Sequence, residues 1–89
     1  MRLTLSVPDY SPEDGLVCEF EDDYRIDVRV EDDLSVCISA DKGGLISLAK
    51  LMLTLSADNV PDGVHAHLDS LDGLEEGSSE LVIEKKRAQ

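Results

Sequence analysis

The chain has 89 residues, enough for one domain with a single small hydrophobic core. It contains 20 acidic and eight basic residues, and the resulting net charge of −12 disfavours contact with phosphate backbones and anionic membranes. Aromatic residues make up only 3% of the chain, which argues against a platform that stacks single-stranded bases. Acidic residues alternate with apolar ones, as is typical of a folded chain that attracts cations or basic proteins.

Alternating apolar and polar residues predict four consecutive strands in the first half of the chain. Their predicted inward-facing sets are Leu3, Leu5 and Val7; Leu16, Cys18 and Phe20; Ile26, Val28 and Val30; and Leu34, Val36 and Ile38. Short, turn-rich connections separate these strands, so we expect antiparallel hairpins. Cys18 and Cys37 would point to opposite faces, which disfavours a disulfide between them.

From Lys42 to Ala57 the apolar period becomes that of a helix, with Asp41 as its predicted N-cap. The apolar residues cover roughly 220° of the helix circumference, a wider stripe than one sheet face usually covers. The remaining polar arc consists of Gly43, Ser47, Lys50 and Thr54. Either flanking loops cover the excess apolar surface, or the surface binds a partner or a second copy in a homodimer.

After a turn at residues 58–63, alternation predicts a fifth strand through Val64, Ala66 and Leu68 and a last strand from Glu80 to Lys85. The predicted order is β-β-β-β-α-β-β. This order indicates an α+β domain with an antiparallel sheet of about six strands and one helix packed on one face. We expect a single domain over residues 1–84, followed by a basic tail over residues 85–89.

The N-terminus opens directly on a strand pattern and does not resemble a signal peptide. No apolar stretch approaches the ~20 residues needed to span a bilayer. We therefore expect a cytoplasmic protein.

Period-2 spacing places His65, His67 and Asp69 side by side on one face of the fifth strand. Two imidazoles and a carboxylate can ligate zinc or ferrous iron. The chain has no third histidine and no ligand spacing around its cysteines, so we expect no metal and no cofactor here. The preferred interpretation is a polar ladder bonded to acids of the neighbouring strand. A small metal-binding or catalytic domain on this face is the alternative.

No nucleophile elbow, phosphate-binding loop or dinucleotide fingerprint occurs in the chain, so we expect a binding protein and not an enzyme. Acidic residues cluster at predicted hairpin turns and in one late loop, where their combined field would speed association with a basic protein. The predicted partner-binding residues are Asp22, Asp23, Asp32, Asp33, Glu75 and Glu76, together with His65, His67 and Asp69.

Residues 40–84 carry a recognisable set of motifs. They are Ala40-Asp41, Gly44-Leu45, Leu48-Ala49 and Leu55, then Pro61-x-Gly63-x-His65-x-His67-Leu68-Asp69, Leu74-x-x-Gly77-Ser78 and Glu80-Leu81-Val82-Ile83. This set resembles the immunity protein 32 family of bacterial polymorphic toxin systems. The resemblance implies a protein that binds a cognate toxin and neutralises it in the producing cell, without a cofactor. We expect it to act by occlusion. Many such toxins are basic nucleases, which an acidic inhibitor would suit.

Overall fold

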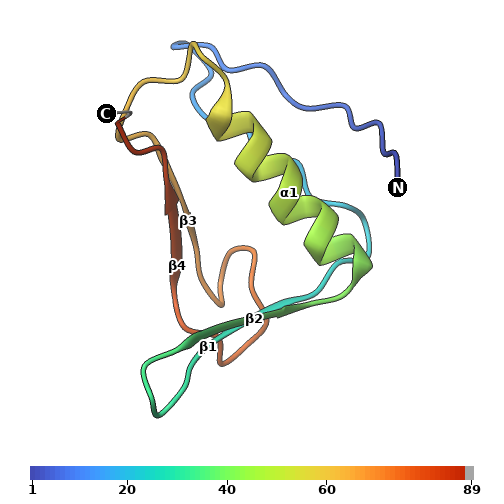
Figure 1. Cartoon of the computed structure of the whole chain (residues 1–89), viewed down its shortest axis with the longest axis vertical. Coiled ribbons are helices and arrows are strands. Elements are labelled where there is room, and N and C mark those ends of the chain that lie inside the picture. Colours follow the sequence, from blue (N-terminus) through green and yellow to red (C-terminus); the bar gives the residue numbers. More distant parts are fainter. Residues whose placement is uncertain (88–89) are drawn as a thin grey trace.

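In the computed structural model, which describes residues 1–87, one helix and four short strands form an α+β fold (Figure 1). β1 (Ile26–Val30) and β2 (Val36–Ala40) form a first antiparallel hairpin, and β3 (His65–Leu68) and β4 (Leu81–Glu84) form a second. The helix α1 (Lys42–Ser56) lies between them in the chain. The α+β class is therefore confirmed.

The predicted sheet of about six strands is wrong. The described residues form two separate two-stranded sheets, β1-β2 and β3-β4. The register places Val28 opposite Ile38 in the first sheet and Ala66 opposite Ile83 in the second. Each hairpin therefore turns its own apolar row toward a common core.

The free edge of β1 is covered by an irregular segment, residues 75–79, that precedes β4. The backbone N–H of Glu75 donates to Ile26 O at 2.8 Å, and that of Ser79 donates to Val28 O at 2.8 Å. The Val28 N–H donates to the hydroxyl oxygen of Ser78 at 3.2 Å. Because these bonds satisfy the backbone groups along the edge, the second hairpin joins the first through a loop and not through a shared ladder.

The two strands predicted nearest the N-terminus are not formed. Residues 2–7 have no regular structure, and Leu16 and Phe20 reach the core from an irregular segment. Phe20 stacks on Tyr24, with ring centroids 4.7 Å apart. Alternation indicates which side chains face inward, but it does not supply the neighbouring strand that backbone hydrogen bonds require.

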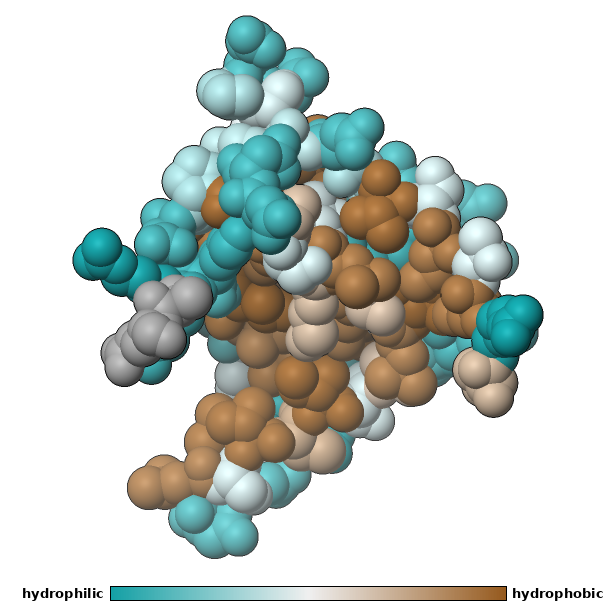
Figure 2. All heavy atoms as spheres, turned by 45° about the horizontal axis from the view of Figure 1, so that its top comes forward, coloured by the Kyte–Doolittle hydropathy of each residue, from teal (hydrophilic) through white to brown (hydrophobic). Residues whose placement is uncertain are grey.

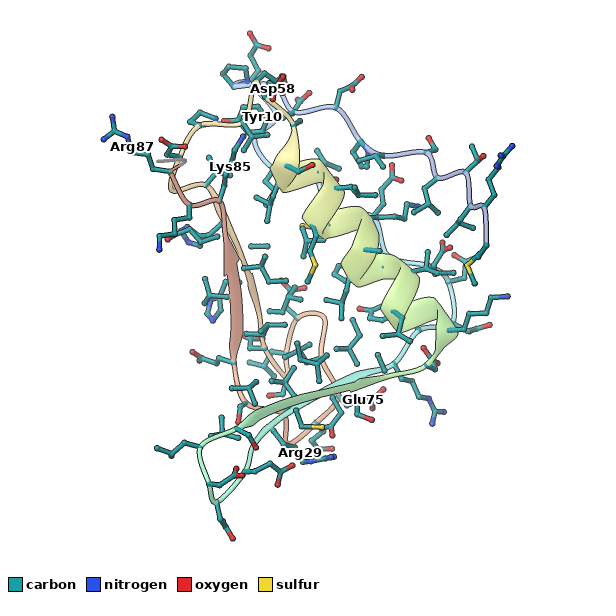
Figure 3. All side chains as sticks on the ribbon, in the orientation of Figure 1. Tyr10, Arg29, Asp58, Glu75, Lys85 and Arg87 are labelled. Carbon is teal, nitrogen blue, oxygen red and sulfur yellow. The ribbon has the colours of Figure 1, made fainter. Side chains whose placement is uncertain are left out.

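The core lies where α1 and the two hairpins meet, and Figure 3 shows their side chains filling the space between them. Its buried apolar residues are Ile26, Val28, Leu48, Leu51, Leu55, Val60, Ala66, Leu68 and Leu74. They come from every element except β2 and β4, whose Ala40, Leu81 and Ile83 pack around the core.

The predicted N-cap of α1 is confirmed. Asp41 Oδ1 accepts hydrogen bonds from Gly44 N–H at 2.8 Å and from Arg25 N–H at 3.0 Å. These two bonds favour the carboxylate and hold the pKa of Asp41 below its usual value. The same side chain therefore starts the helix and fixes it to the residue before β1.

The helix does not present its polar arc to solvent. Ser47 and Thr54 are 1% and 2% exposed, and the segment of residues 19–24 contacts this side of the helix at Ser47 and Lys50. The Ser47 hydroxyl donates to Gly43 O at 2.7 Å and accepts from Glu21 N–H at 2.8 Å, and Lys50 Nζ lies 3.6 Å from Glu19 Oε2. The Ser47 hydroxyl tolerates burial because it both donates and accepts a hydrogen bond, and the Thr54 hydroxyl donates to Lys50 O at 2.8 Å.

The opposite side of α1 is left apolar and open. Leu45, Met52 and Leu53 are 56%, 48% and 48% exposed. The flanking chain covers the polar arc, and so the excess apolar surface that the sequence revealed remains uncovered among the described residues.

Lys85, the first residue of the predicted basic tail, is hydrogen-bonded to the fold. Its N–H donates to Val64 O at 2.9 Å, which continues the pairing past β4, and its Nζ donates to Ala57 O at 2.6 Å near the end of α1. Residues 88 and 89 of the predicted basic tail lie outside the described residues.

Both cysteines are free thiols. In the described part of the chain, no helix has the length and apolar character required to cross a membrane.

Candidate functional site

The outer face of the second hairpin carries the two histidines. Along β3, Ala66 and Leu68 are buried and His65 and His67 are exposed, as the alternation predicts. The histidines have different partners. His67 Nε2 lies 3.4 Å from Glu80 Oε2, whereas His65 Nδ1 lies 3.1 Å from the Gly63 carbonyl oxygen. A close contact between a histidine and an acid, Glu80 just before β4, is thus present at His67.

His67, Asp69 and Glu80 form a compact cluster in which the candidate ligand atoms all lie within 4.8 Å of one another. The β3-β4 register explains it, because Leu68 pairs with Leu81 and the next residues, Asp69 and Glu80, come opposite each other. Asp69 Oδ1 also accepts the Leu71 N–H at 3.0 Å, which orients the carboxylate. The sequence did not single out Glu80 as a partner-binding residue, because its role depends on the register.

The six predicted acidic residues lie in three separate loops and are all exposed. Asp22 and Asp23 precede β1, Asp32 and Asp33 form the turn that follows it, and Glu75 and Glu76 belong to the loop along its free edge. The three loops thus border one strand from its start, its end and its side. None of them adjoins the histidine face in the hairpin register.

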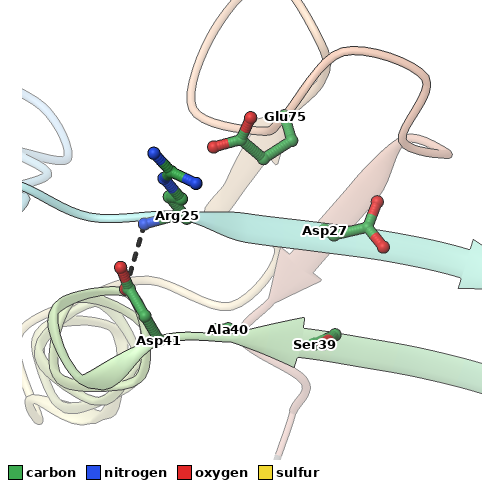
Figure 4. Close-up of a pocket in the computed structure, with 6 residues that line it drawn as sticks. All are labelled: Arg25, Asp27, Ser39, Ala40, Asp41 and Glu75. Atoms are coloured by element: carbon green, nitrogen blue, oxygen red, sulfur yellow. Dashed lines mark hydrogen bonds between the residues drawn. The ribbon is translucent and has the colours of Figure 1, made fainter.

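A shallow hollow of about 450 Å³ lies beside the start of β1. It is lined by Arg25, Asp27, Ser39, Ala40, Asp41 and Glu75. Figure 4 shows the side chains of Arg25 and Glu75 on the same side of β1, while Asp41 is held by the Arg25 N–H. Because charges of both signs meet there, the hollow suits polar contacts with a protein surface.

The β1-β2 turn is tightly ordered. Asp33 Oδ1 accepts the Ser35 hydroxyl at 2.6 Å and the Ser35 N–H at 3.0 Å, and these bonds lower the pKa of Asp33. The Leu34 N–H donates to Glu31 O at 2.9 Å, and the Glu31 N–H donates to Ser35 O at 2.8 Å. These hydrogen bonds stabilise the shape of the acidic turn.

The predicted inward set of the fourth strand is wrong. Leu34, Val36 and Ile38 are 81%, 61% and 39% exposed. Ile38 lies opposite the buried Val28, so it has the expected facing, but the hairpin extends past the core that would cover its outer half. The sequence pattern predicts correctly to which face of the strand Ile38 points, but it does not predict whether other residues bury that face.

The comparisons with known proteins identify the family. Residues 35–86, more than half of the chain, match the model of the family described as immunity protein 32. No curated protein and no solved structure matches the chain. The matched region contains β2, α1, β3 and β4, with the histidine face and the loop along β1. The resemblance noted in the sequence is confirmed, and the chain belongs to the immunity protein 32 family.

Proposed function

We propose that the protein neutralises a cognate bacterial toxin in the cytoplasm of the producing cell by binding it and occluding a surface that the toxin needs. The observation that carries this proposal is the family match over residues 35–86. The match supports an immunity protein. That the protein acts by binding, without a cofactor and without catalysis, is part of the proposal.

The charge of the chain favours a basic toxin, such as a nuclease. The sequence carries a net charge of −12, and three exposed acidic loops border β1. Acids placed in this way produce a field that attracts a basic surface and speeds its approach. The histidine face with Asp69 would add polar contacts.

Titrating this protein into an activity assay of the protein encoded by the adjacent gene tests the proposal. We expect toxin activity to disappear at a stoichiometric ratio, and the association rate to fall by roughly tenfold or more as salt rises. Replacing Asp32 and Glu76 with Asn and Gln should slow association more than replacing Asp58 and Asp62, two exposed acids away from β1, with Asn. Unchanged toxin activity in a molar excess of the protein would refute the proposal.

One observation favours a second candidate function, metal binding. The ligand atoms of His67, Asp69 and Glu80 lie within 4.8 Å of one another, and the His67-Glu80 pair is separated by 3.4 Å. A tetrahedral zinc ion bound at about 2.1 Å to each ligand would hold those ligands about 3.4 Å apart. The side chain of Glu80 is 72% exposed, so it has room to change rotamer and bring its carboxylate to the distance that zinc requires.

Calorimetric titration of untagged protein with Zn²⁺ checks this candidate. We expect binding and a raised melting temperature in the wild type, and loss of both in His67→Ala and Glu80→Gln. The matched controls are His65→Ala and Glu84→Gln, a cross-strand pair on the same hairpin outside the cluster. If the control pair weakens binding as much as the cluster pair, or if the wild type binds no Zn²⁺, metal binding at this cluster is ruled out.

A further inference from the structure

The core-facing side of the first hairpin continues into solvent. On β1, Ile26 and Val28 are 0% and 1% exposed, but Val30, next in the same row, is 54% exposed. Its cross-strand partner Val36 is 61% exposed. Figure 1 shows the β1-β2 turn at an extremity of the molecule, away from α1 and the second hairpin. Part of an apolar row therefore projects beyond the core that the same row helps to form.

Leu34 lies at the end of this projection and has an unfavourable backbone conformation. Its φ of 69° lies in the left-handed region, and among the described residues Leu34 is the only one besides glycines with a positive φ. In a hairpin loop of this kind the left-handed position is usually glycine, because a Cβ is disfavoured there. The side chain is also 81% exposed. A strained backbone and an exposed leucine at one position point to a role outside folding.

Acidic side chains surround this leucine. Glu31, Asp32 and Asp33 are the three residues before it, and all are exposed. Hydrogen bonds from Ser35 to Asp33 keep the turn in shape. An apolar centre with a charged rim is the usual anatomy of a protein interface. In Figure 2, hydrophobic and hydrophilic residues lie side by side in the part of the molecule that protrudes at the lower left.

The acidic rim indicates what the turn contacts. A second copy of the chain would bring its own three acids against these, and like charges in contact oppose association. A basic surface is complementary. The exposed apolar side of α1, with a hollow of about 510 Å³ beside Leu45 and Leu3, has no comparable rim, since residues 43–57 contain no acid.

We propose that the β1-β2 turn, residues 30–36, is an inserting element of the toxin interface. Leu34 enters an apolar depression on the toxin, and Glu31, Asp32 and Asp33 pair with basic groups around that depression. The inference rests on the proposed function, because the occupant is the toxin. The family match begins at Ser35, so the turn from Glu31 to Leu34 lies outside it, where a contact that distinguishes one toxin from another would be placed.

Leu34→Gly tests the proposal because it separates folding from binding. Glycine relieves the left-handed backbone, so the melting temperature should stay the same or rise. Removal of the anchoring side chain should weaken toxin binding by roughly tenfold or more, seen mainly as faster dissociation. The matched control is Leu71→Ala, which removes another leucine, 96% exposed, in a different loop and should leave binding unchanged.

The outcomes are distinct. If the wild type does not bind the toxin, the proposed function fails and this inference fails with it. If the wild type inhibits the toxin and Leu34→Gly inhibits it equally well, the inference alone is overturned. Light scattering adds a further check, since a Leu34-dependent dimer with unchanged inhibition would assign the turn to a second copy and overturn the toxin contact.

Discussion

Gly44→Ala should destabilise the protein by about 3 kcal/mol, although alanine is the better helix former. A Cβ at Gly44 would clash with the Arg25 carbonyl oxygen and would lie 2.9 Å from Ile26 Cγ1 and 3.0 Å from Ala40 Cβ. The first turn of α1 therefore rests directly on both strands of the first hairpin. Because the obstructing oxygen is backbone, the contact cannot be relieved by a side-chain rotation. Chemical denaturation of the variant and the wild type measures the difference.

The control for this prediction is Gly77→Ala. Gly77 has a φ of 85°, but nothing lies within 4 Å of the position that its Cβ would take. The backbone conformation alone should cost about 1–2 kcal/mol there. If Gly44→Ala is as stable as the wild type, or more stable, then the gain in helix propensity outweighs any clash. That result would contradict a close contact between the first turn of α1 and β1.

Ser78→Ala should cost about 1–3 kcal/mol, because it leaves a buried N–H without an acceptor. The Ser78 hydroxyl accepts from Val28 N–H at 3.2 Å and donates to Asp27 Oδ1 at 3.1 Å. Val28 is 1% exposed, so water cannot readily replace the lost bond. Thermal or chemical unfolding measures the loss.

Ser79→Ala is the matched control for Ser78→Ala. Ser79 contacts the same residue of β1, but through its backbone N–H, which donates to Val28 O and which alanine retains. We expect a change within about 0.5 kcal/mol, as for most substitutions away from such features. Equal losses in the two variants would show that the hydroxyl of Ser78 does not connect the hairpins.

Contacts that hold the fold together explain part of the sequence resemblance. Asp41, Gly44 and Ser78 all occur in the motifs that resemble the family, and all three hold elements of the fold together. Asp69 orders the loop after β3 as well as adjoining His67. The motif positions therefore divide into residues that build the fold and residues that remain exposed on it.

The sequence by itself determined the helix and the four strands that flank it, but not the segment before β1, where two predicted strands are not formed. The change of hydrophobic period and the cap at Asp41 predict α1 to within about one residue, because both signals act within a turn or two of the chain. Alternation predicts the strands on both sides of the helix and places His65 and His67 on an outer face. The acidity and the family motifs come from the residues directly, and the family match over residues 35–86 confirms what the motifs indicate.

Only the tertiary structure decided which surfaces are covered. Ser47 is buried, and Leu45 and Met52 are exposed, because residues 19–24 pack on one side of α1 and not on the other. Glu80 joins His67 through a register set between segments distant in the chain. Leu34 projects because the first hairpin is longer than the core beneath it. Periodicity gives the direction of a side chain within its own element, but burial depends on non-local packing that no single segment contains.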